Sequence, residues 1–134
     1  MSTQTRTSTG KVVLGVAAAI VIAAVGNAIV SYLAQALGAD PQAVEGLQPK
    51  GYVVLTALGV IIAAFAWASI RKRAKDPART LGKLVPIVVV LSFLADVPVY
   101  FLPGASLVGV LALMVMHVVV AVVAVPIFRR VLPV

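Results

Sequence analysis

Long apolar stretches alternate with short polar segments along this chain of 134 residues, and four stretches at about residues 12–37, 51–70, 84–102 and 106–128 are almost free of charged side chains. The hydrocarbon core of a bilayer is about 30 Å thick, which roughly 20 helical residues cross at a rise of 1.5 Å each. The stretches lack the two-residue alternation of a membrane β-barrel, and their backbone groups must bond internally in lipid. The pattern therefore predicts an all-α, polytopic integral membrane protein built as a four-transmembrane-helix bundle.

The polar segments at the two ends complete the predicted organisation. Residues 1–11 are rich in Ser and Thr, and we expect a disordered cytoplasmic tail there. Residues 12–128 form the transmembrane domain, and residues 129–134 form a second cytoplasmic tail. The first apolar stretch is far longer than the apolar region of about 7–15 residues in a signal peptide, so we expect it to remain as a span.

Composition excludes the soluble classes of protein. Hydrophobic residues make up 62% of the chain and charged residues 11%, with a mean hydropathy of +1.13. Ordinary globular domains carry about 25% charged residues. The chain has no cysteine, which excludes disulfides, thiolate metal sites, iron–sulfur clusters and cysteine nucleophiles. The formal net charge of +7 lies in loops and tails without a nucleic-acid-reading module, so we expect no nucleic-acid partner.

The positions of the basic residues predict the topology. Ten of the eleven Lys and Arg residues fall in the two tails and in the segment between the second and third stretches, and only Lys50 falls on the other side. Cytoplasmic segments hold the excess of Lys and Arg, so we expect both termini in the cytoplasm of a cell with a bacterial-type plasma membrane. The basic run Arg71, Lys72, Arg73 and Lys75 either fixes this topology or also contacts anionic lipid.

Aromatic residues fall near the predicted ends of the spans, as in the aromatic belts of membrane proteins. They are Tyr32, Tyr52, Tyr100 and Phe101 on one side of the membrane and Trp67 and Phe128 on the other. Pro98 lacks the amide that would bond the Leu94 carbonyl, so we expect the third helix to loosen near that end.

Small residues at helical spacing indicate where helices approach closely, because lipid tails are as apolar as leucine and close contact drives association. Two ridges of this kind occur, and we expect them to seat the first two helices together, although either could make a homodimer contact. They are Gly15, Ala19 and Ala23 in the first span and Gly59, Ala63 and Ala66 in the second.

Polar residues recur at four-residue steps in two spans, which places each set on one helix face. The sets are Asn27, Ser31 and Gln35 in the first span and Ser92, Asp96 and Tyr100 in the third, with Thr56 and His117 in the other two. All lie between mid-membrane and the non-cytoplasmic side. If the faces converge, they line an outward-open pocket with His117 near its floor; otherwise they serve as interhelical hydrogen-bond links.

Asp96 and His117 are the ionisable groups of this set. A charged Asp within a transmembrane helix costs roughly 2.5–3.5 kcal/mol, which favours a functional or proton-linked role. Counting along the two helices puts the pair about 7–8 Å apart in depth, so we expect water or Ser92 to mediate between them. One His and one Asp supply too few ligands for a metal, and no cofactor is expected.

The run Leu94-Ala95-Asp96-Val97-Pro98 and the pair Met116-His117 carry a resemblance to small four-helix bacterial membrane proteins catalogued as domains of unknown function. The resemblance covers the whole chain and implies a four-helix membrane fold with both termini inside, but no activity. The length and number of spans are also similar to those of small multidrug transporters. Those proteins use a carboxylate in the first span, and the first span here has none.

Three functions fit the sequence. The first is binding or transport of a cation, proton or small solute through Asp96 and His117, with Ser92, Asn27, Ser31, Tyr100 and Thr56 nearby. The second is a non-catalytic accessory subunit of a larger membrane complex or a homo-oligomer, suggested by the small-residue ridges and minimal loops. The third is an intramembrane enzyme with Asp96 and His117 as an acid–base pair. The sequence contains no recognisable nucleophile arrangement, so binding or transport is the preferred hypothesis and the enzyme a remote one.

Overall fold

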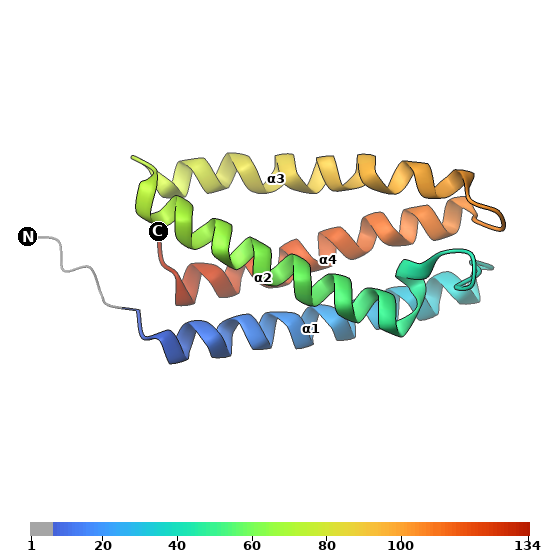
Figure 1. Cartoon of the computed structure of the whole chain (residues 1–134), viewed down its shortest axis with the longest axis horizontal. Coiled ribbons are helices and arrows are strands. Elements are labelled where there is room, and N and C mark those ends of the chain that lie inside the picture. The colour runs from blue at the N-terminus through green and yellow to red at the C-terminus, as the bar shows by residue number, and fades with distance from the viewer. Residues whose placement is uncertain (1–6) are drawn as a thin grey trace, which may run out of the picture.

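The computed structural model describes residues 7–134, and in that range it consists of long antiparallel helices lying side by side (Figure 1). The elements in chain order are α1 (Thr9–Ala36), the short 3₁₀ helix η1 (Glu45–Leu47), α2 (Pro49–Arg73), α3 (Pro77–Asp96), the 3₁₀ helix η2 (Val97–Phe101) and α4 (Leu107–Val131). When α3 and η2 are taken together as one segment, each of the four long helical segments is long and apolar enough to cross a membrane. The expected all-α, four-helix membrane architecture is confirmed.

Polar caps place the helix starts outside the apolar stretches. The side chains of Ser8, Asp76 and Ser106 each accept a hydrogen bond from a backbone N–H in the first turn of α1, α3 and α4, which satisfies amides that have no partner within the helix. Pro77 follows Asp76 at the first position of α3, where its fixed φ suits a helix. As a result α3 begins well before residue 84.

The helices also extend into the predicted tails. Helix α1 begins at Thr9 and α4 continues to Val131, so part of each segment predicted as a tail is helical. Residues 1–6 lie outside the described residues. At the other end of the bundle, α3 changes to a 3₁₀ helix over Val97–Phe101, which confirms the loosening expected from Pro98.

Helices α2 and α4 lie between α1 and α3, and α1 packs most extensively on α4 (Figure 1). The approach is close at two glycines of α1. A Cβ added at Gly15 would lie 2.7 Å from Cγ1 of Val131, and one added at Gly26 would lie 2.8 Å from Cγ1 of Val119. The small-residue ridge of α1 therefore contacts α4, with Ala19 and Ala23 fully buried.

The expectation that the two ridges seat the first helical hairpin is wrong. Gly59, Ala63 and Ala66 are all exposed on the outside of the bundle, and a Cβ at Gly59 would meet no atom within 4 Å. Helix α2 instead buries Thr56, Val60 and Trp67. The small-residue face of α2 therefore lies on the surface of the bundle.

Two apolar clusters form the core, one toward each end of the bundle. The start of α1, the end of α4 and the connection between α2 and α3 lie together at one end (Figure 1), which we call the basic end because it carries most of the Lys and Arg residues. The basic-end cluster comprises Ala19, Val60, Trp67, Leu81, Ala124, Phe128 and Leu132. The far-end cluster comprises Ala34, Ala39, Val44, Leu47, Ala112 and Met116.

Trp67 and Phe128 belong to the core and do not face lipid. They are 3% and 1% exposed and meet edge to face, with ring centroids 5.6 Å apart. Their assignment to an aromatic belt is therefore wrong. In contrast, Tyr32, Tyr100 and Phe101 toward the far end are exposed.

Candidate functional site

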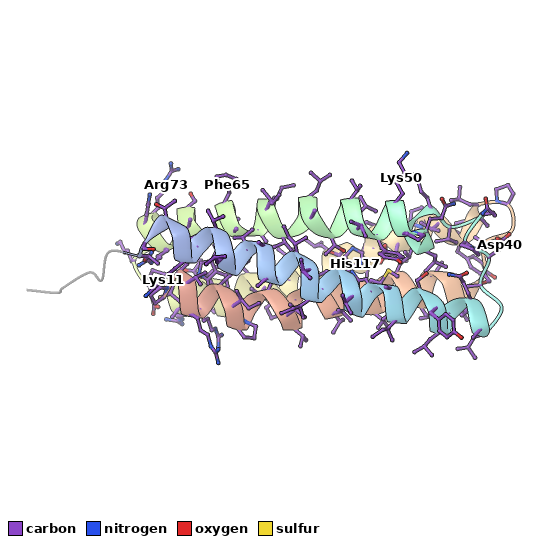
Figure 2. All side chains as sticks on the ribbon, turned by 90° about the horizontal axis from the view of Figure 1, so that it is seen from below. Lys11, Asp40, Lys50, Phe65, Arg73 and His117 are labelled. Carbon is purple, nitrogen blue, oxygen red and sulfur yellow. The ribbon has the colours of Figure 1, made fainter. Side chains whose placement is uncertain are left out.

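Asp96 and His117 form the most distinctive contact in the bundle. Asp96 is the last residue of α3 and is 7% exposed. His117 lies on α4, between the two ends of the bundle in Figure 2. Its Nδ1 atom is 3.0 Å from Oδ2 of Asp96. A carboxylate and an imidazole at this separation can share or exchange a proton.

The expected gap of 7–8 Å in depth does not separate the two groups, because that count followed the helix axes alone. Side chains lean toward the N-terminus of their own helix. Since α3 and α4 are antiparallel, Asp96 leans toward the basic end and His117 leans toward the far end. The two side chains therefore converge, and neither water nor Ser92 is needed between them.

Nδ1 of His117 has two oxygen neighbours, the second being the backbone oxygen of Leu113 at 2.9 Å. When Nδ1 carries a hydrogen, that single hydrogen can point at only one of them. The contact with Leu113 has good hydrogen-bond geometry, whereas Oδ2 of Asp96 is fully buried without a well-formed hydrogen bond among the described residues. The carboxylate is thus close to the imidazole yet retains an open acceptor.

A second polar group links α1 to α2. The Asn27 amide donates to Oγ1 of Thr56 at 2.9 Å, and both residues are buried. Ser31, one turn further along α1, donates to the backbone oxygen of Leu47 and accepts from the Gln35 amide at 3.0 Å. The polar face of α1 therefore forms hydrogen bonds to α2 and to η1 at the far end.

The two polar faces do not converge on one pocket. Ser92 donates to the backbone oxygen of Val88 in its own helix, and Tyr100 is exposed, so Asp96 alone of the α3 set is buried. The far-end cluster fills the bundle beyond these residues, with Val44 and Leu47 at 2% and 0% exposure. The described residues thus show a packed far end where the sequence suggested an outward-open pocket.

Of the two side chains in the pair, that of His117 is the more exposed. The side chain of His117 is 40% exposed, against 9% for Asp96. His117 therefore stands between the buried carboxylate and the surroundings of the helices at mid-bundle.

The basic run at the end of α2 lies at the basic end, where Figure 2 shows Lys11 and Arg73, opposite the end that carries Asp40 and Lys50. Lys72, Arg73 and Lys75 are exposed, and Arg71 donates to Oγ1 of Thr7 at 3.1 Å. These residues are free to meet solvent or lipid headgroups, and contact with anionic lipid stays a prediction.

Comparison with known proteins gives a family and no activity. Within residues 7–134 the structure contains no group of three His, Cys, Asp or Glu side chains that could hold a metal ion. The same range matches a family described as "Family of unknown function (DUF6069)", and the chain belongs to that family. This confirms the resemblance to a domain of unknown function. No curated protein and no solved structure matches the chain.

Proposed function

We propose that this protein binds a proton or a small cationic or amphipathic solute inside its bundle, through Asp96 and His117. The observation that carries the proposal is the 3.0 Å contact between Oδ2 of Asp96 and Nδ1 of His117, in which the buried oxygen keeps an open acceptor. Ionisable groups within a membrane are costly, and they mark ion, proton or ligand pathways more often than structural positions.

The pair provides a simple exchange. Protonated His117 beside ionised Asp96 has no net charge, and neither does neutral His117 beside protonated Asp96. A cationic solute that reaches the carboxylate competes with the imidazolium for the same oxygen. Binding of the cation would therefore release a proton from His117.

The experiment is native mass spectrometry of the protein extracted gently from its own membrane. We expect a small adduct in the wild type. Asp96→Asn keeps the side-chain shape but removes the charge, and loss of a hydrogen bond to a charged group weakens binding roughly tenfold to a hundredfold. His117→Ala should also reduce the adduct. Ser92→Ala is the matched control, because the Ser92 hydroxyl donates to the backbone oxygen of Val88 in its own helix.

An adduct that survives Asp96→Asn at wild-type intensity would exclude Asp96 as the binding group. Loss of the adduct in Ser92→Ala to the same extent as in Asp96→Asn would lead to the same conclusion. Circular dichroism of each variant establishes that the bundle is intact.

A second candidate is an accessory subunit of a larger membrane complex. It is favoured by the exposed small-residue face of α2, formed by Gly59, Ala63 and Ala66, because such faces allow another helix to approach closely. In the same spectra this candidate predicts a stoichiometric second protein that Gly59→Leu releases and Asp96→Asn retains.

For location, we propose a bacterial-type plasma membrane with both termini in the cytoplasm. Support comes from the gathering of Lys and Arg at the basic end, where Figure 2 shows Lys11 and Arg73, which fits the positive-inside rule.

A further inference from the structure

A cavity of about 340 Å³ lies at the basic end, remote from Asp96 and His117 along the bundle. Its lining residues come from α2, α3, α4 and the segment after α4, and they are Trp67, Ala78, Leu81, Arg129 and Val134. Its volume is that of a small-molecule site, for which about 300–1,000 Å³ is usual. None of these residues belongs to the polar groups at mid-bundle.

The cavity has an apolar wall and a charged rim. Trp67 and Leu81 are 3% and 5% exposed, and the Trp67 indole is held in place because Nε1 donates to the backbone oxygen of Leu132 at 2.9 Å. Ala78 and Arg129 are exposed. The arrangement suits an amphiphile that places carbon against the indole and an anion against the guanidinium.

The charge of Arg129 has no acidic partner among residues 7–134, where the one ion pair within salt-bridge distance is that between Asp96 and His117. The only acidic side chain of the basic end in this range is Asp76, which caps α3 by accepting from the Arg79 amide. An Arg guanidinium presents a planar fork of donors that matches phosphate oxygens. The rim therefore favours a phosphate-bearing ligand.

We propose that this cavity binds the phosphate headgroup of an anionic membrane lipid, with Arg129 on the phosphate and with Trp67 and Leu81 against the glycerol and first acyl carbons. The site is defined by the cavity and differs from the basic run at the end of α2. It lies at the end of the helices, which is the level of lipid headgroups in a bilayer.

Trp67 is the only tryptophan of the chain, so it reports on the cavity without labelling. The full-length protein is reconstituted in phosphatidylcholine vesicles that contain either dibrominated phosphatidylglycerol or dibrominated phosphatidylcholine at equal mole fraction. Bromine quenches indole fluorescence at short range. We expect stronger quenching by the anionic lipid in the wild type.

Three variants test the assignment. Arg129→Gln should lower the preference for the anionic lipid at least about tenfold, the effect of losing one hydrogen bond to a charged group. Ala78→Phe fills the cavity and should abolish the preference. Arg130→Gln removes the neighbouring, exposed charge, which does not line the cavity, and should retain it.

Equal quenching by the two lipids in the wild type, or equal losses in Arg129→Gln and Arg130→Gln, would overturn the proposal in favour of diffuse surface charge. Inorganic phosphate added to the vesicles distinguishes a lipid headgroup from a free anion as the occupant of the cavity. A preference that phosphate leaves unchanged supports a lipid, and displacement by phosphate assigns the cavity to a free anion instead.

Discussion

The buried polar side chains differ in how completely they are hydrogen-bonded. Ser31 both donates and accepts, whereas Asn27 donates to Thr56 but leaves its Oδ1 atom buried without a partner among the described residues. Hydrogen bonds between membrane helices contribute only about 0.6–2 kcal/mol. A lost partner can cost more than the bond contributes, because a buried donor is then left unpaired.

At the Asn27–Thr56 pair, we therefore expect the single variant at Thr56 to be less stable than the double variant at both positions. Thr56→Val keeps the volume but leaves the Asn27 amide unpaired, and we expect the free energy of unfolding to fall by about 1–3 kcal/mol. Adding Asn27→Leu removes the unpaired amide, so the double variant should regain part of that loss. Unfolding in a sodium dodecyl sulfate titration, followed by circular dichroism, measures both changes.

Ser92→Ala is the control for this titration, because the Ser92 hydroxyl bonds a backbone oxygen of its own helix. It should change the free energy of unfolding by less than about 0.5 kcal/mol. A Thr56→Val protein as stable as the wild type would show that the Asn27 amide finds another acceptor.

At Asp96 and His117 the sequence identifies the residues but not their contact. An ionisable side chain in an apolar stretch is conspicuous, and so both are predicted as members of one site. Their separation depends on where each side chain leans and on the change from α to 3₁₀ helix at Val97, neither of which a count of residues along the axis includes.

Among the elements, the close contact between α1 and α4 depends on glycines, which have no side chain to keep the two helices apart. Gly15 and Gly26 bring α1 close to valines of α4, and valine in a helix holds one χ1 rotamer almost exclusively. We expect Gly15→Ala and Gly26→Ala each to lower the free energy of unfolding by about 1–3 kcal/mol, as overpacking does. The same titration measures the loss.

Gly59→Ala is the matched control on α2, because an added Cβ there meets no atom within 4 Å. It should leave stability unchanged or raise it slightly, since alanine favours the helix. A loss at Gly59 equal to that at Gly15 would indicate that α2 packs against another protein or a second copy through this face.

The two ridges also show what spacing leaves undecided. Both have small residues at helical intervals, yet only the α1 ridge is buried. The deciding information lies on the neighbouring face of α2, where Thr56, Val60 and Trp67 share a side and are buried. Spacing reveals that a helix has a small-residue face, but which face meets a neighbour depends on how all the helices fill the core together.

For the molecule as a whole, four spans and their connections follow from hydropathy, because length and apolar character alone decide what can cross a bilayer. The cavity at Trp67 does not follow from the sequence. It is formed where the indole of α2 donates to the backbone oxygen of Leu132, the residue directly after α4, and no local pattern near Leu132 indicates that contact.

The charge distribution makes the orientation testable, and the absence of cysteine makes the test direct. Gln42 is exposed between α1 and α2, and Lys75 is exposed between α2 and α3 at the opposite end of the bundle. Because Lys and Arg are retained on the cytoplasmic side, we expect a membrane-impermeant maleimide to label Gln42→Cys in intact cells. Lys75→Cys should react only after permeabilisation.

Labelling of both variants after permeabilisation shows that each cysteine is reactive, so protection in intact cells then reports sidedness alone. Lys75→Cys removes one basic residue of the ten assigned to the cytoplasm, which leaves the charge bias nearly intact. The reverse pattern would place both termini outside. The cavity would then face the outer surface, and the outer leaflet would supply the lipid proposed for Arg129.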